Sequence, residues 1–505
     1  MSLKPPFFLL FFLTFLIISS QEINKGNIVK DRQFLIDHSE LTASDSIGNF
    51  VSIRPHRVNG TLRNYFVEFY DNMNFTNRVE IKTQNETKIL DVFILNEKAH
   101  VFIKEKINKS ISLRCDVIDL KTQSFEQKSL LEVDKNSTPE VYRALKNDFE
   151  INLEYSSKIV LSFPVIEHKS LYAFVKVFSD ELEELNEHKI FADKNILNKN
   201  VSFLNAAQYQ DKIYLLFNLI YSKDKKTYKL IELNSQKSLE VHIVEDSYEL
   251  INSEIRATDY IISGLYSNHK EGGFKGFTHY TIDLDSFSLK SQLQTVFSNK
   301  KASKYFSGLF KGNRSIDIKD IFIDEEFNTY IVGQFYFTTK EHINAAFPVG
   351  FPIATFTLGY LSVFITINPV KSYKVYDDIL IGKINTKGEL LWDTILELRQ
   401  TEKINSKYNK KDSSTYTFFD GNQLNILING YINMDKEKLI VKQDKRFSKT
   451  NLYAIKINPK GKIIPEILFA NSDVIFIAET AVKSKENIHI LGQGNMRKQL
   501  LKIKF

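Results

Sequence analysis

The sequence predicts an all-β protein, a single β-propeller of seven or eight four-stranded blades. Three observations support this prediction: short apolar strands recur along the chain, helical periodicity is almost absent, and aromatic residues are abundant. The chain has 40 Phe and 23 Tyr against 10 Pro and 19 Gly, and aromatic and β-branched residues favour strands. A pair of β-sandwiches is the main competing architecture.

The first twenty residues have the composition of a signal peptide. A short basic start precedes the apolar run Phe7–Ile18, and two serines follow it. Small residues at this place suit a signal peptidase, so we expect cleavage near Ser20 and export to the periplasm, the cell surface or the medium. The run is shorter than the roughly 20 residues that a spanning helix needs. A retained anchor is the alternative, because Ile18 stands where a small residue is usual.

Residues 21–505 are expected to form the propeller domain. Strands come in groups, each with an apolar strand, a polar turn and a second apolar strand that ends in Asp or Asn. The groups recur about every 50 to 60 residues once one insertion is set aside, and this spacing fits four-stranded blades. Stacking blades around an axis buries both faces of each sheet. The groups begin at Tyr65, Asp91, Ile159, Lys212, Tyr260, Thr329, Leu424 and Ile488.

The last of these groups is short. We expect the strands between Phe34 and Ser52 to complete its blade and to close the ring. Two segments depart from the strand pattern: Pro139–Asn147 is expected to be a short helix, and the acidic run Asp180–Glu187 is expected to be a polar turn.

Composition excludes several classes of function. Cys115 is the only cysteine, so no disulfide can form within the chain, and its alternating neighbours predict a buried thiol. The formal net charge of +6 comes from scattered lysines, which argues against a nucleic-acid partner. The ten histidines form no metal-binding motif, so neither a metal nor a cofactor is expected.

Acidic residues leave one route to catalysis open. They cluster at Asp180–Glu184 and at Asp324–Glu326, and Asp283 and Asp285 flank one leucine. A glycosidase needs two carboxylates held about 5 or 7–9 Å apart. In a propeller, carboxylates from different blades can converge in the central channel. A carbohydrate-active enzyme is therefore the alternative function, although each cluster alone is typical of a turn or a solvated surface.

The segment His342–Val370 differs from the rest of the chain. It has no charged residue and interrupts the blade between Gly333 and Asp378. Prolines and glycines argue against a transmembrane helix there. A hairpin that covers one end of the propeller is the first interpretation, and an exposed apolar surface for a partner or a lipid is the second. The candidate contact residues are its aromatic side chains Phe347, Phe351, Phe356, Tyr360 and Phe364.

The clearest repeat lies at Asp378–Gly388. An alternating strand ends in Lys, a polar turn contains Gly388, and an apolar strand with Trp392 follows. This pattern resembles the repeat of bacterial β-propellers of the SBBP type, and Asn451–Gly461 is similar to it. The order of features over about the last 180 residues also resembles uncharacterised exported β-propeller proteins of Bacteroidota. The resemblance implies the fold and export, and it brings no catalytic residue.

The repeat has a physical interpretation of its own. Gly388 and Gly461 stand where a tight turn needs a positive φ, and Trp392 is expected to be a wedge between two blades. The favoured function is an exported, non-catalytic propeller that acts as an interaction or binding scaffold. Its expected partner is an envelope protein or a glycan, with peripheral membrane contact through residues 342–370 as a further option.

Overall fold

A computed structural model gives the structure of the protein. It describes residues 22–30, 41–58, 61–83, 86–146, 151–155, 158–193, 200–222, 225–244, 247–268, 273–299, 314–342, 345–348, 364–367, 370–403, 415–421, 423–435, 438–442, 451–470, 474–494 and 497–505. At residues 57, 58, 61, 63, 268, 314, 315, 337–342, 345–348, 364–367, 370–377, 399–403, 431–435 and 438–442 only the backbone is described.

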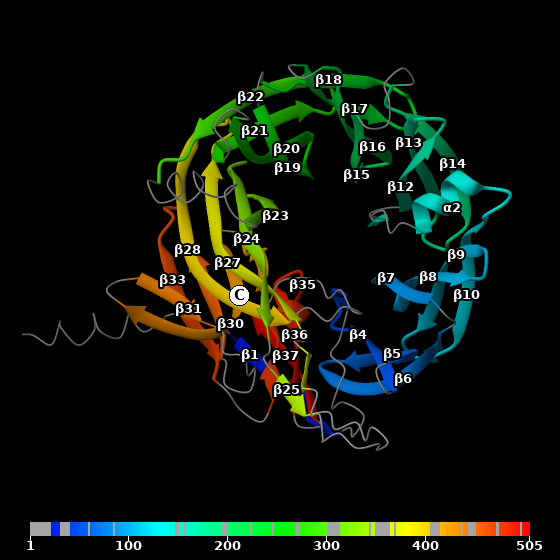
Figure 1. Ribbon diagram of the computed structural model, residues 1–505, viewed down its shortest axis with the longest axis vertical. Helices are drawn as coiled ribbons and strands as arrows, with labels where there is room; N and C mark the ends of the chain where they lie inside the picture. Colours follow the sequence, from blue (N-terminus) through cyan, green and yellow to red (C-terminus); the bar gives the residue numbers. More distant parts are fainter. Residues whose placement is uncertain are drawn as a thin grey trace, which may run out of the picture. The chain divides into compact units, whose positions relative to one another are not determined.

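The chain is an all-β, eight-bladed β-propeller of four-stranded antiparallel blades (Figure 1). The predicted fold and number of blades are therefore confirmed. Blade 1 has β3 (Leu41–Ser44), β4 (Phe50–Val58), β5 (Thr61–Asp71) and β6 (Asn74–Lys82). Blade 2 has β7 (Glu86–Leu95), β8 (Lys98–Ile107), β9 (Ser110–Asp119) and β10 (Phe125–Asp134). Blade 3 has β11 (Asn152–Tyr155), β12 (Ile159–Glu167), β13 (Ser170–Phe178) and β14 (Glu184–Phe191).

Blades 4 and 5 repeat the same order of four consecutive strands. Their strands are β15 (Val201–Tyr209), β16 (Lys212–Ile220), β17 (Lys226–Glu232), β18 (Ser238–His242); and β19 (Ser247–Arg256), β20 (Asp259–Asn268), β21 (Phe274–Asp283), β22 (Ser288–Val296). The predicted short helix is confirmed as α2 (Pro139–Lys146), which buries Val141 and Leu145 and contacts β12. The acidic run Asp180–Glu187 is a turn only as far as Glu183, because Glu184–Glu187 belong to β14; the expected turn is therefore only partly confirmed.

Blades 6 and 7 are joined into one sheet. Blade 6 has β23 (Arg314–Ile323), β24 (Thr329–His342), β27 (Val370–Ile384) and β28 (Leu390–Lys403), and blade 7 has β29 (Thr415–Phe419), β30 (Leu424–Asp435), β32 (Asn451–Ile457) and β33 (Ile463–Phe469). The extra strand β31 (Lys438–Lys442) pairs antiparallel with β30 and parallel with β28. Backbone hydrogen bonds thus connect these two blades.

Blade 8 is completed by the N-terminal part of the chain. Its strands are β34 (Ile475–Phe476) and β35 (Val482–Ser484), separated by the 3₁₀ turn η5 (Ala478–Thr480), then β36 (Asn487–Gly494) and β37 (Arg497–Lys504). The outer strand is β1 (Glu22–Lys25), and β2 (Val29–Lys30) also pairs with β37.

The prediction that Phe34–Ser52 closes blade 8 is wrong in its residues, because the strands found there, β3 and β4, pair with each other in blade 1. β1 is only four residues long. A strand this short gives almost no alternation to detect in the sequence, so its role was missed.

Contacts divide the chain into two compact units. Unit 1 comprises Met1–Ile103, Cys115–Gln127 and Asn471–Phe505, and unit 2 comprises Lys104–Arg114 and Lys128–Ala470. Blades 1 and 8 therefore belong to unit 1, and blades 3–7 belong to unit 2. Blade 2 has residues in each unit. In unit 2 the first strands of blades 4, 5, 6 and 7 (β15, β19, β23 and β29) contact one another in succession.

The hydrophobic core consists of separate layers between successive blades. Between blades 6 and 7, Ile379 and Ile381 of β27 pack with Ile426 of β30. The alternate residue Leu380 points the other way and packs against blade 5. This alternation explains the nearly continuous apolar runs of the sequence, because strands buried on both faces lack the usual polar positions. The same alternation places Cys115 among the buried residues, as expected.

The two predicted glycine turns follow one design. Gly388 and Gly461 have φ of +86° and +79°, and in each turn an Asn side chain three residues earlier accepts two backbone N–H hydrogen bonds of 2.9–3.0 Å. Trp392 lies against Gly461 and donates its indole N–H to the Pro459 carbonyl at 2.8 Å. The predicted wedge between blades 6 and 7 is confirmed.

Candidate functional site

The insertion 342–370 lies at the end of a long hairpin. β24 and β27 pair as far as His342 and Val370, which stand opposite each other. Beyond them, β25 (Ala345–Pro348) and β26 (Phe364–Ile367) form a separate antiparallel pair, with Phe347 opposite Ile365 and Pro348 opposite Phe364. The segment therefore includes strands and starts and ends at paired positions.

The five candidate contact residues are placed only in part. Phe347 and Phe364 belong to β25 and β26, where the backbone alone is described. Phe351, Phe356 and Tyr360 lie outside the described residues. The predicted contact surface stays a prediction. Over the described chain, none of the helices has the length and apolar character needed to cross a membrane.

The acidic clusters singled out in the sequence belong to turns. Asp324 accepts backbone and side-chain hydrogen bonds from Asn328 at 2.8–3.1 Å and pairs with Lys383 at 2.9 Å. Asp283 accepts the backbone N–H of Ser286 at 2.6 Å, and Lys290 lies 2.7 Å from it. These carboxylates hold strand connections in place, and none of these contacts brings two acids from different blades together.

A different pair of carboxylates interacts electrostatically across two neighbouring blades. Glu254 lies on β19 and Asp320 on β23, the first strands of blades 5 and 6. Burial raises the pKa of Asp320 to about 6. The pKa of Glu254 is also raised, first by partial desolvation and second by repulsion from Asp320. Thr417 of β29 donates its hydroxyl to Asp320.

These two acids were missed because each sits singly in an alternating strand. The only available signal was position: both belong to the first strand of a four-strand group. Other polar groups lie on the first strands of blades 4 and 5. Asn205 of β15 donates its side-chain amide to the Ser253 hydroxyl at 2.6 Å and accepts a hydrogen bond from the Tyr260 hydroxyl at 3.0 Å. A carboxylic acid with a pKa near 6 suits general acid catalysis at neutral pH.

Glu249 shows the opposite situation, a carboxylate whose hydrogen bonds are complete. It accepts hydrogen bonds from Tyr228 at 2.9 Å and from Thr278, Tyr280 and Gln294 at 2.8 Å each. The donors come from blades 4 and 5, so the network fixes one blade against the next. With four donors in place, Glu249 has little remaining capacity for a ligand.

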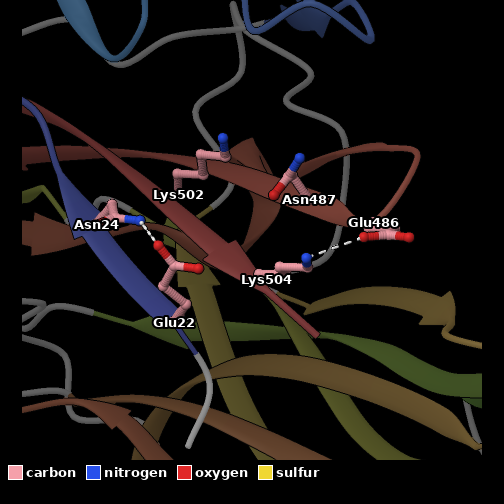
Figure 2. Close-up of a pocket in the computed structure, with 6 residues that line it drawn as sticks. All are labelled: Glu22, Asn24, Glu486, Asn487, Lys502 and Lys504. Carbon is pink, nitrogen blue, oxygen red and sulfur yellow. Dashed lines mark hydrogen bonds and ion pairs between the residues drawn. The ribbon is translucent and has the colours of Figure 1, made fainter.

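A polar pocket of about 220 Å³ lies on blade 8 (Figure 2). Its lining comes from both ends of the chain: Glu22, Asn24, Glu486, Asn487, Lys502 and Lys504. Asn24 donates to Glu22 at 3.0 Å, and Lys504 lies 3.3 Å from Glu486. Figure 2 shows these two contacts on opposite sides of the pocket, with Lys502 and Asn487 on a third side. No sequence motif marks this site, because strands far apart in the chain build it.

Buried histidines are structural in this fold. His279 is 2% exposed and contacts the hydroxyls of Ser263 and Thr281 at 2.6 and 3.1 Å, and burial lowers its pKa to about 4. His489 is 1% exposed and lies 6.2 Å from the Phe50 ring. Among the residues that the structure describes, no group of three potential metal ligands occurs.

No protein-family model matches the chain, and no curated protein sequence matches it. Similar solved structures include a prolyl endopeptidase, at 8% identity and a TM-score of 0.37 over 78% of this chain and 55% of the enzyme. The WD40 domain of SCAP from fission yeast has 8% identity and a TM-score of 0.35 over 97% and 96%. A polysaccharide lyase, the PL25 ulvan lyase, has 10% identity and a TM-score of 0.38 over 81% and 90%.

The chain thus spans about half the length of the prolyl endopeptidase, 55%. The three similar proteins include enzymes and a WD40 domain, and at such low identities they assign no function to this chain.

Proposed function

We propose that this protein is an exported, non-catalytic propeller that serves as a binding scaffold for an envelope protein or a glycan. The observation that carries this proposal is the long hairpin of blade 6. β24 and β27 have 14 and 15 residues, whereas the strands of blades 3–5 have at most ten.

The hairpin projects beyond its own blade. The pairing of β23 with β24 ends at Phe337 and that of β28 with β27 ends at Tyr373, opposite Thr339, while β24 and β27 pair as far as His342 and Val370. The three residues of each strand beyond β28 measure roughly 10 Å. The projecting end carries the uncharged segment 342–370, whose aromatic side chains suit contact with a protein pocket or stacking on a sugar ring.

The export part of the proposal rests on the sequence. Residues 1–20 have the order of a signal peptide, and the repeat at Asp378–Trp392 resembles those of exported SBBP-type propellers and of Bacteroidota proteins. Intact-mass measurement of the protein recovered from its native cells tests this part, with a mature chain that begins at Gln21 as the expected result. A chain that retains residues 1–20 would contradict it.

The scaffold function is tested by deleting the insertion. Because His342 and Val370 are paired, residues 343–369 can be replaced by an Asn-Gly turn that closes the hairpin. We expect this variant to keep its thermal unfolding temperature and to lose its partner. In cells, a photo-crosslinking residue at position 351 should capture that partner, while one at the exposed Phe125 should not.

Each outcome of the crosslinking bears on the proposal. Capture of one protein or glycan that disappears in the deletion variant supports it and identifies the partner. Adducts only with lipid would replace the scaffold function with membrane attachment. Equal labelling from positions 351 and 125 would remove the special role of the insertion.

A carbohydrate-active enzyme is the second candidate, and Glu254 with Asp320 is the observation that favours it. Their raised pKa values agree with the requirement for one protonated and one ionised carboxyl group. Hydrolysis of a polysaccharide panel should then fall at least about 100-fold in both Glu254→Gln and Asp320→Asn. Activity that survives both substitutions would exclude this pair.

A further inference from the structure

The pocket on blade 8 exists only when both ends of the chain come together. Glu22 and Asn24 are supplied by β1, and Lys502 and Lys504 by β37 (Figure 2). Lys504 stands directly opposite Glu22 in the strand pairing, and Lys502 stands opposite Asn24. All four side chains therefore point to the same face of the sheet, because residues directly opposite in a ladder share a face.

Two of the four charged side chains in the pocket form an ion pair with each other. Lys504 is paired with Glu486 at 3.3 Å. Within the described part of the chain, the side chain of Lys502 has no hydrogen-bond or ion-pair partner, and the carboxylate of Glu22 accepts only the amide of Asn24. A separated cation and anion thus remain, and the pocket as a whole carries no net formal charge.

We propose that this pocket binds a small zwitterion, a molecule of the size of a free amino acid with one carboxylate and one ammonium group. The carboxylate faces Lys502 and the side-chain amide of Asn487, and the ammonium group faces Glu22. A simple anion attracted by Lys502 is repelled by Glu22, and a simple cation meets the reverse situation. A ligand with both charges gains both attractions. The polar lining supplies further donors and acceptors.

Binding of this ligand stabilises the closure of blade 8. The ligand contacts β1 and β37 together, and the two strands are adjacent only in the folded blade. A ligand that binds the folded state alone raises its stability in proportion to the logarithm of its concentration. β1 pairs on one side only, with β37, so its backbone amides are expected to gain the most protection from hydrogen exchange.

The test uses thermal unfolding of the full mature chain with each of the twenty L-amino acids. Acetate and methylammonium, which carry one charge each, are the controls. We expect at least one amino acid to raise the Tm by roughly 2–4 °C near saturation, and neither control ion to do so. Hydrogen exchange of the peptide that contains Ile23 should slow under the same conditions.

Matched variants locate the effect. Lys502→Gln and Glu22→Gln should each abolish the Tm shift, whereas Lys30→Gln, an exposed lysine on β2 outside the pocket, should retain it. The Lys502 side chain makes no hydrogen bond or ion pair among the described residues, so Lys502→Gln should have the Tm of the unliganded parent. If Lys502→Gln folds poorly, Glu22→Gln at an exposed position provides the same test.

Three results would overturn the proposal. One is the absence of any shift or protection with all twenty amino acids. Another is an equal shift with acetate, which would indicate a site for simple anions. The third is a shift that survives Lys502→Gln and Glu22→Gln, which would place the ligand elsewhere. None of these results bears on the hairpin of blade 6, so the scaffold function is tested independently.

Discussion

Buried polar side chains in this protein differ in how completely they are hydrogen-bonded. Glu249 has four donors around its carboxylate. His489 has none: both ring nitrogens are buried without a hydrogen-bond partner among the described residues. A buried polar group without a partner loses its hydration without compensation, so His489 and the desolvated Asp320 are positions where folding costs free energy.

His489 makes the protein sensitive to acid. Burial, together with the charge of Lys502, lowers its pKa to about 4, below the 6.5 of an unfolded chain. From pH 6.5 down to 4 the unfolded state therefore takes up a proton that the folded state does not, and stability falls by up to about 1.4 kcal/mol per pH unit. In His489→Leu this loss should disappear. Urea unfolding at pH 7.5, 5.5 and 4.5 gives the free energy of unfolding of both proteins. A difference in this free energy between variant and parent that stays the same at all three pH values would contradict the prediction.

Asp320 has the opposite dependence on pH. Its folded pKa of about 6 lies above the unfolded 3.8, so the folded state prefers the protonated form, and stability is lost as pH rises from 3.8 to 6. Asp320→Asn should therefore gain on the order of 1–3 kcal/mol at pH 7, and this gain should vanish near pH 4. Asp317→Asn on the same strand is the control, and the comparison uses denaturant midpoints at both pH values.

Two glycine turns with positive φ differ in the space available for a side chain. At Gly461 a side chain would meet two obstacles, the positive φ of +79° and the Trp392 ring, which would lie 2.8 Å from an added Cβ. At Gly421 the φ is +100° but the nearest atom to an added Cβ is 3.9 Å away. The two glycines thus separate the conformational cost of a turn from the cost of packing.

Alanine substitutions at these glycines should differ in size. Gly421→Ala should lower the free energy of unfolding by about 1–2 kcal/mol, the cost of the left-handed backbone conformation alone. Gly461→Ala must in addition displace Trp392, at a further cost of about 1–3 kcal/mol. Chemical unfolding gives both free energies, and tryptophan fluorescence of the single Trp should change only in Gly461→Ala. Equal destabilisation of the two variants would show that Trp392 moves aside freely.

Local chemistry explains which elements could be predicted from the sequence. Strand groups, the α2 helix and the Gly388 and Gly461 turns depend on neighbours within a few residues, and they were predicted correctly. The strand β1, the bridge from β28 to β31, and the pair Glu254 and Asp320 depend on segments tens to hundreds of residues apart. A single sequence carries no mark of such pairings, and so the pocket on blade 8 was not foreseen.

At the scale of the whole molecule, its two ends are held together in unit 1. β1 pairs with β37 over four residues, from Glu22 opposite Lys504 to Lys25 opposite Leu501. A buried ionic cluster also connects blades 1 and 8: Glu68 of blade 1 contacts Arg54 at 3.5 Å and also Lys498 of blade 8, which stands opposite Val29 of β2. Such a cluster is strongly destabilised when one member loses its partner.

Removal of the closing strand should therefore weaken the whole protein. A chain that begins at residue 31 lacks β1 and β2 and leaves the outer edge of β37 unpaired. We expect it to lose on the order of 3 kcal/mol or more and to aggregate through the exposed edge. A chain that begins at residue 21 is the control and should have full stability.

A synthetic peptide of residues 21–30 offers a complementary measurement. Added to the shortened chain, it should pair with β37 and restore the Tm, since strand addition to an open sheet edge is a known mode of recognition. An unchanged Tm in the shortened chain, with or without peptide, would show that closure by β1 contributes little.

The closing strand also sets the timing of folding during synthesis. Glu22 is made early, whereas its partner Lys504 follows it by 482 residues (504 − 22). At about 5–20 residues per second, a ribosome needs roughly half a minute to a minute and a half for the residues between them. During that interval the middle blades can form, while the first strand waits unpaired. β1 is thus made long before the strand that it pairs with, and blade 8 cannot be completed until β37 has left the ribosome.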